Sequence, residues 1–125
     1  MSEVLEIAKR ARAASLKLAS YSSEAKNAAI EKIADAVLAR ADEIKAANAL
    51  DVEAARGKIS APMLERLSLN DKKIAAMAEG ARQVAKLPDP VGEIIESTVR
   101  PNGLRIDKVR VPIGVIGIIY ESRPN

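Results

Sequence analysis

A short polar segment follows the last apolar run of the sequence, and it places Tyr120, Glu121, Ser122, Arg123 and Asn125 close together. An arginine can hold two oxygens of a carboxylate or phosphate through its forked donors, and an asparagine amide can donate to a developing oxyanion. Open parallel sheets bind ligands where strands end at their carboxyl edge. The segment therefore suggests a site for a small anion, although its composition fits equally well a polar loop that faces water.

The apolar run over residues 113–119 predicts a β-strand, because Ile and Val occupy both its odd and its even positions. Such a strand suits the interior of a sheet that is covered on both faces. Gly114 and Gly117 allow the close approach of either a neighbouring element or a ligand. They do not form a dinucleotide-binding turn, because no helix follows them. We expect this buried-type strand to belong to a larger α/β protein, of which the chain is a fragment.

The composition excludes several kinds of chemistry. The 125 residues contain no Cys and no His, so thiolate nucleophiles, imidazole bases, disulfides and the usual zinc ligands are absent, and no metal site is expected. The chain has 20 Lys and Arg residues against 17 Asp and Glu residues, and the two signs alternate along it. Nucleic-acid binding needs clustered basic residues and, for single strands, stacking aromatics. We therefore expect no nucleic-acid partner.

The first residues of the sequence are charged and have a helical pattern, unlike a secretory signal. No apolar run reaches the length of a membrane span. These features predict a cytoplasmic protein without a membrane partner.

Apolar residues at three- and four-residue spacing predict helices over most of the first 90 residues. The expected helices cover 2–19, 23–40, 42–56, 61–67 and 71–87. Whether residues 39–42 form a break or only a bend stays open. Pro62 at the start of the fourth helix and Asn70 before the fifth are typical of helix beginnings. Because the sequence lacks Phe and Trp, we expect the helices to pack through aliphatic side chains and close Ala contacts.

The pattern changes from helical to extended after Pro90. Asn102 and Gly103 predict a hairpin turn in which both residues take positive φ. The alternation of apolar residues in the second strand slips at Asp107 and Lys108, which indicates a β-bulge or a change of partner strand.

Three stretches of the sequence resemble the gamma-glutamyl phosphate reductase family, also called glutamate-5-semialdehyde dehydrogenase, of the aldehyde dehydrogenase superfamily. They are NAAIEKIADAVLARADEIKAANALDVEAAR, MLERLSLNDKKIAAMAEGARQVAKLPDPVG and GLRIDKVRVPIGVIGIIYESRPN. The last stretch is the most specific of the three. The resemblance covers nearly the whole chain and corresponds to the amino-terminal part of such enzymes.

The resemblance implies an aldehyde-dehydrogenase-like α/β fold and an enzyme of proline biosynthesis. Such enzymes reduce L-glutamyl 5-phosphate to L-glutamate 5-semialdehyde with NADPH and release phosphate. A cysteine thiolate attacks the acyl phosphate in these enzymes, and the nicotinamide reduces the resulting thioester. The chain has no cysteine, so we expect it to be inactive by itself.

The resemblance also implies roles for the residues at the end of the chain. The segment expected to lie near the NADPH cofactor is formed by Ile119, Tyr120 and Glu121. An ungapped alignment places the family's oxyanion asparagine at Arg123, whereas two extra residues place it at Asn125, which we favour because an amide brings no permanent charge. Ser122 and Arg123 then become candidates for binding the carboxylate or phosphate of the substrate.

The expected organisation has three parts: a helical lead-in over residues 1–90, a β-hairpin over 91–112, and the first strand and loop of a truncated cofactor-binding domain over 113–125. The hairpin resembles the oligomerisation strands of the superfamily, which implies a homo-oligomer.

Two alternatives remain. The chain could be a helical interaction module whose last strand adds to a partner's sheet, or the reductase part of a bifunctional pyrroline-carboxylate synthase. A kinase domain before the first helix would distinguish the second alternative, and the start of the sequence at Met1 speaks against it.

Overall fold

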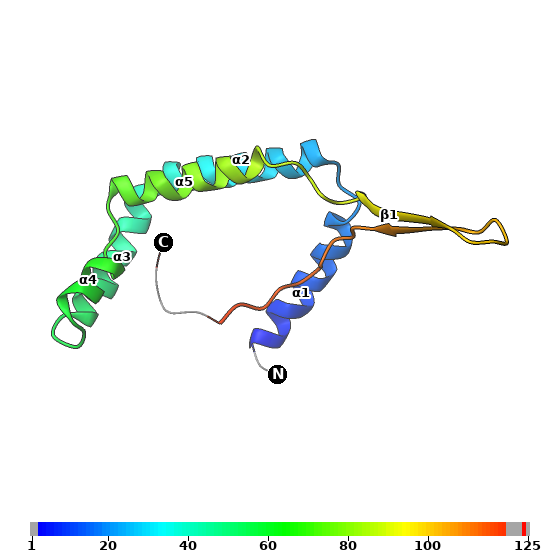
Figure 1. The fold of residues 1–125 in the computed structure, drawn as a ribbon. Coiled ribbons are helices and arrows are strands. Elements are labelled where there is room, and N and C mark those ends of the chain that lie inside the picture. The colour runs from blue at the N-terminus through cyan, green and yellow to red at the C-terminus, as the bar shows by residue number, and fades with distance from the viewer. Residues whose placement is uncertain (1–2, 120–123, 125) are drawn as a thin grey trace. The chain divides into compact units, whose positions relative to one another are not determined.

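A computed structural model describes residues 3–119 and 124, and this part of the chain forms five helices and one two-stranded antiparallel sheet (Figure 1). The described residues divide into two compact units. The hairpin unit lies within Met1–Ser23 and Pro88–Gly117, and the helical unit lies within Glu24–Leu87 and Ile118–Asn125. The mostly helical fold with one hairpin that the sequence predicts is confirmed.

Four helices form most of the helical unit: α2 (Ser23–Ala39), α3 (Ala41–Ala55), α4 (Ala61–Leu67) and α5 (Asp71–Ala85). All four were predicted, and the uncertain boundary near residue 40 is a true break. Arg40 has φ −105° and ψ 21°, outside the α-helical region, and α3 begins at the next residue. Pro62 lies in the first turn of α4, where its missing N–H costs nothing.

The core of the helical unit is built mainly from alanine. Among the described residues, the buried apolar side chains are Ala34 of α2 and Ile74, Ala78 and Ala85 of α5. In Figure 1, α5 runs alongside α2, and Arg82 of α5 bonds Asp35 of α2 at 2.6 Å. The buried side chains are mostly small, which fits the expectation that the helices pack through alanine and aliphatic side chains.

The hairpin unit contains α1 (Glu3–Leu18), β1 (Ile94–Val99) and β2 (Arg105–Val109). The turn differs from the predicted one, because no described residue other than glycine has a positive φ, so Asn102 does not. Gly103, with φ 83°, donates to the carbonyl of Arg100 at 2.8 Å. Pro101 and Asn102 therefore form the centre of a type I turn that ends in a left-handed glycine, a common three-residue hairpin loop.

The predicted bulge is present, but its extra residue lies on the first strand. Ile94 pairs with Val109 and Glu96 pairs with Lys108, so Ile95 has no direct partner on β2. The shifted apolar pattern of the second strand therefore did indicate an irregular register. The additional residue, however, belongs to β1 and not to β2.

The predicted buried strand over residues 113–119 is not formed. These residues belong to no helix or strand, and their apolar side chains are exposed, from 44% at Val115 to full exposure at Ile119. A strand requires a neighbour that bonds its backbone, and the described residues supply none to this segment. The sequence of the segment suits the interior of a sheet, but no described strand lies beside it to form that sheet.

No helix in the described ranges combines the length and the apolar character needed to cross a membrane.

Candidate functional site

Five of the predicted site residues, Tyr120, Glu121, Ser122, Arg123 and Asn125, lie outside the described residues. The sixth, Ile119, is described, and its side chain is fully exposed. The roles assigned to these residues therefore stay predictions. The structure does describe the segment that leads to them.

The part of that segment formed by Gly114–Ile116 passes along α1 within the hairpin unit, and the two form a shallow groove. Figure 1 shows the segment beside α1. The groove has a volume of about 560 Å³. It is lined by Ala11, Ala14, Ser15, Lys17, Leu18, Tyr21 and Gly114–Ile116. Small residues of α1 let the backbone of the segment come close, while Lys17 supplies a cation to the wall.

Gly114 is required where the segment approaches α1. Its φ of 94° favours glycine, and a Cβ at this position would lie 3.6 Å from Nη1 of Arg12. A Cβ at Gly117 would meet no atom within 4 Å among the described residues. A Cβ at that distance from Arg12 would make an ordinary van der Waals contact, so the preference for glycine at position 114 comes from its φ and not from tight packing.

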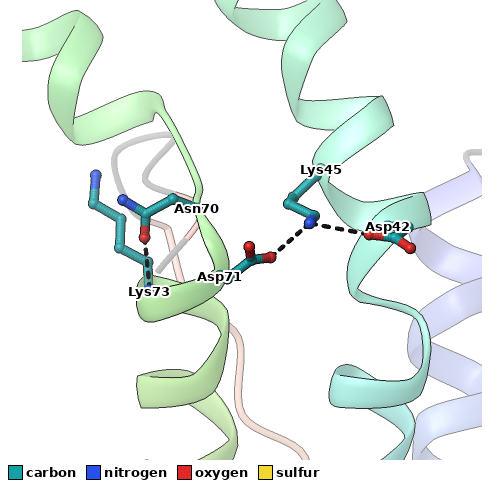
Figure 2. Close-up of polar contacts among 5 residues, drawn as sticks. All are labelled: Asp42, Lys45, Asn70, Asp71 and Lys73. Atoms are coloured by element: carbon teal, nitrogen blue, oxygen red, sulfur yellow. Dashed lines mark hydrogen bonds and ion pairs between the residues drawn. The ribbon is translucent and has the colours of Figure 1, made fainter.

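A polar cluster joins α3 to α5 in the helical unit (Figure 2). The ammonium of Lys45 bonds Asp71 at 2.5 Å and Asp42 at 3.0 Å. The hydrogen bond to Asp71, followed by that to Asp42, raises the pKa of Lys45. Through its bond to Asp71, Lys45 of α3 connects that helix to α5. The side-chain oxygen of Asn70 accepts a hydrogen bond from the backbone N–H of Lys73 at 2.9 Å and so caps α5.

Asn48 is the buried polar residue of the described chain. Its amide donates to the carbonyl of Leu67 at 2.9 Å and accepts the N–H of Leu69 at 2.7 Å. The ammonium of Lys73 donates to the carbonyls of Glu65 and Ser68, at 2.7 and 2.6 Å. Together the two side chains fix the loop between α4 and α5.

The sequence analysis missed Asn48, although a signal was present. Asn48 lies four residues after Ile44 and four before Val52, on the same face of α3. A polar amide at an apolar position of a helix is a candidate for a buried hydrogen-bonding residue. The partners Leu67 and Leu69 are distant in sequence and could not have been named.

Two further perturbed groups, Arg40 and Glu43, form an ion pair on the surface. The hydrogen bond to Glu43 raises the pKa of Arg40, and the same pair lowers the pKa of Glu43. In the described ranges, no three acidic side chains gather as metal ligands would.

Comparison with models of protein families found no match. Comparison with individual proteins found reductases whose sequences match this chain over nearly its whole length. The chain is 57% identical over 126 aligned residues to a protein of Carboxydothermus hydrogenoformans, covering 100% of this chain and 30% of that protein. It is 55% identical to one of Caldanaerobacter subterraneus, covering 98% and 30%. The class defined by these matches is that of reductase enzymes.

Both proteins are named gamma-glutamyl phosphate reductase. The crystal structure of the Thermotoga maritima protein of that name matches with a TM-score of 0.93 and 51% identity, covering 98% of this chain and 30% of the other. The Saccharomyces cerevisiae structure matches with a TM-score of 0.79 and 35% identity, covering 90% and 29%. The predicted resemblance to the gamma-glutamyl phosphate reductase family is confirmed, and the chain spans about 30% of the length of these relatives.

Proposed function

We propose that the chain contributes to the NADPH-dependent reduction of L-glutamyl 5-phosphate to L-glutamate 5-semialdehyde with release of phosphate, in the proline biosynthesis of the cytoplasm. The observation that carries this proposal is the match to the Thermotoga maritima reductase, at 51% identity over 98% of the chain. Because the chain has no cysteine, it would provide binding and positioning while the nucleophile comes from elsewhere.

The cofactor is proposed to lie near Ile119, Tyr120 and Glu121. A bound nicotinamide cofactor supplies the hydride for such a reduction. Ile119 is exposed, so an apolar surface is accessible to the face of a ring. That observation fits the proposal, and the choice of NADPH over NADH belongs to the proposal as well.

The substrate is proposed to contact the three polar residues that follow. Ser122 and Arg123 would hold its carboxylate or phosphate, because a hydroxyl and a guanidinium both donate to anionic oxygens. Asn125 would donate to the oxyanion. The support is the chemical type of these residues and their position within the match to the Carboxydothermus hydrogenoformans protein, which covers 100% of the chain.

The hairpin is proposed to be an oligomerisation element, so that the intact enzyme is a homo-oligomer. The apolar side chains of its two strands, such as Ile95 and Ile106, are about half exposed. The three-part organisation at residues 1–90, 91–112 and 113–125 remains part of the same proposal.

A chimera tests the proposed function. In the Thermotoga maritima enzyme, the segment that this chain matches would be replaced by the 125 residues of this chain. We expect phosphate-dependent NADP⁺ reduction with glutamate 5-semialdehyde by the chimera and none by the chain alone. Activity of the purified chain alone, or a folded chimera without activity, would refute the proposal.

Three variants of the chimera test the residue roles. We expect Arg123→Ala to raise KM for the semialdehyde or phosphate and Asn125→Ala to lower kcat. Lys58→Ala, on an exposed loop of the helical unit, is the matched control and should change neither constant. Equal effects of all three variants would contradict the assigned roles.

A further inference from the structure

The turn of the hairpin contains a dipeptide that can modify itself. Asn102 is followed by Gly103, and both residues are exposed. The main-chain nitrogen after an asparagine can attack the side-chain amide, and glycine hinders this attack least because it has no Cβ. A Cβ at Gly103 would meet no described atom within 4 Å apart from its chain neighbours, so the turn is open to water. Asn27, Asn48 and Asn70, by contrast, precede residues that have a side chain.

The reaction is deamidation through a cyclic imide. The nitrogen of Gly103 forms a bond to Cγ of Asn102, the bond from Cγ to Nδ2 breaks, and the proton of the attacking N–H leaves with the amide nitrogen as ammonia. Water from the solvent then opens the ring. Addition of water at Cγ gives aspartate, whereas addition at the main-chain carbonyl carbon gives isoaspartate, in which the chain continues through Cβ and Cγ. Both products carry a new carboxylate, and neither an oxidant nor a reductant is needed.

The closed turn opposes this reaction. The N–H of Gly103 donates to the carbonyl of Arg100 at 2.8 Å, which engages the group that must lose its proton. The side-chain oxygen of Asn102 accepts the N–H of Leu104 at 3.1 Å, which holds the amide against Leu104. The N–H of Arg100 donates in turn to the carbonyl of Leu104 at 2.9 Å. The attack therefore requires a local opening of the hairpin that releases these bonds.

We propose that Asn102 is a site of spontaneous deamidation that the closed hairpin turn restrains, and that isoaspartate at this position prevents the turn from re-forming. The extra main-chain carbon would lie between the carbonyl of Arg100 and the nitrogen of Gly103, so the bond between them loses its geometry. An aspartate, by contrast, retains the main chain and an acceptor for the N–H of Leu104.

The hairpin is sensitive to the loss of a turn because it has few other supports. No described residue of the hairpin unit is buried, and a two-stranded sheet is marginal by itself. The inference concerns the hairpin alone and does not depend on the proposed function.

Incubation of the purified full chain at mildly alkaline pH, in buffer and in concentrated urea, tests the site. Trypsin releases Asn102 within a peptide that ends at Arg105, and mass spectrometry gives the deamidated fraction of that peptide. We expect Asn102 to convert faster than Asn27 in buffer, and roughly threefold or more faster in urea than in buffer. Conversion of Asn27 as fast as that of Asn102 in buffer, or equal rates for Asn102 in the two solvents, would overturn the proposal.

Two variants show whether hairpin opening controls the rate. Asp107→Ala removes the acceptor for Ser97 and Arg105 on the hairpin. Asp51→Ala, at an exposed position of α3, is its control because it changes the net charge equally. We expect Asp107→Ala to accelerate the conversion of Asn102 roughly twofold or more and Asp51→Ala to leave it unchanged. Equal rates in the two variants would overturn the proposal.

The products test the effect on the hairpin. Ion-exchange chromatography collects the deamidated chains by their added charge, labelling by an isoaspartyl methyltransferase measures their isoaspartate content, and Asn102→Asp provides the aspartate form directly. We expect the main-chain amides of β1 and β2 to exchange rapidly in proportion to the isoaspartate content and to stay as protected in Asn102→Asp as in the unmodified chain. Full protection in the isoaspartate form, or an equal loss in Asn102→Asp, would overturn the proposal.

Discussion

The two units of the molecule differ in where they place their apolar side chains. The helical unit buries Ala34, Ile74, Ala78 and Ala85, whereas no described residue of the hairpin unit is buried. The hairpin is held by its main-chain bonds and by surface side chains such as Asp107, and a two-stranded sheet of that kind is marginal by itself. The difference indicates that the helical unit has a small core of its own, while the large apolar side chains described in the hairpin unit stay at least partly exposed.

The largest expected effect comes from removing the one large side chain of that core. Ile74 is 1% exposed, so Ile74→Ala should lower the free energy of unfolding by about 2–5 kcal/mol through lost burial and a cavity. Urea unfolding followed by circular dichroism measures this change. Ile116→Ala, at a 63% exposed position of the hairpin unit, is the control and should change the free energy by less than about 0.5 kcal/mol. Similar losses for the two variants would remove the distinction between the units.

A smaller loss is expected at Asn48. The substitution Asn48→Ala leaves the carbonyl of Leu67 and the N–H of Leu69 without their partner, which should cost about 1–3 kcal/mol. Amide exchange should accelerate in the loop between α4 and α5 and stay unchanged in the hairpin. If the hairpin amides accelerate equally, the two units do not unfold independently.

The cap of α5 should contribute less again. Asn70→Ala removes the acceptor for the N–H of Lys73 and should lower the free energy of unfolding by about 1 kcal/mol. Asn70→Ser, another good capping residue, should retain most of it. A loss for the serine variant as large as that for alanine would show that the side chain matters for something other than capping.

The smallest effect concerns the hairpin and its dependence on pH. The hydroxyl of Ser97, at 2.5 Å, and then the guanidinium of Arg105 lower the pKa of Asp107. Because the folded hairpin favours the ionised carboxylate, this stabilisation is complete above the ordinary pKa of about 4 and is lost as the pH falls through the lowered value. The carboxyl chemical shift of Asp107, followed by NMR, should give a midpoint below that of an unfolded peptide.

Ser97→Ala is the control for that titration and should move the midpoint of Asp107 toward the ordinary value. An unshifted midpoint in the unmodified chain would contradict the role of Ser97.

The sequence predicted the helices well because their signals are local. Asn70 caps α5 and Pro62 begins α4 through interactions within a few residues. The break at Arg40 could not be distinguished from a bend, because it depends on backbone angles that neighbouring residues do not determine. The position of the hairpin was predicted correctly, but the predicted positive φ of Asn102 was wrong. The Asn-Gly pair also fits a type I turn that ends in glycine.

The predicted strand at 113–119 failed for a different reason. A strand forms only when a neighbouring strand bonds its backbone. The apolar pattern of residues 113–119 indicates that the segment suits a sheet interior, but it does not show that the neighbouring strands are present. The contact between Lys45 and Asp71 and the bonds of Asn48 could not be predicted either, because they join residues brought together only by packing. Most of the predicted site, from Tyr120 onward, lies beyond the described residues, apart from Pro124.

The position of Tyr21 on the wall of the groove has a practical consequence. The chain has two tyrosines and no tryptophan, so its ultraviolet emission comes from tyrosine alone. Replacement of Tyr120 by phenylalanine would leave Tyr21 as the single intrinsic fluorophore. Its intensity and anisotropy would then report directly, without any attached dye, on whatever enters the space between α1 and Gly114.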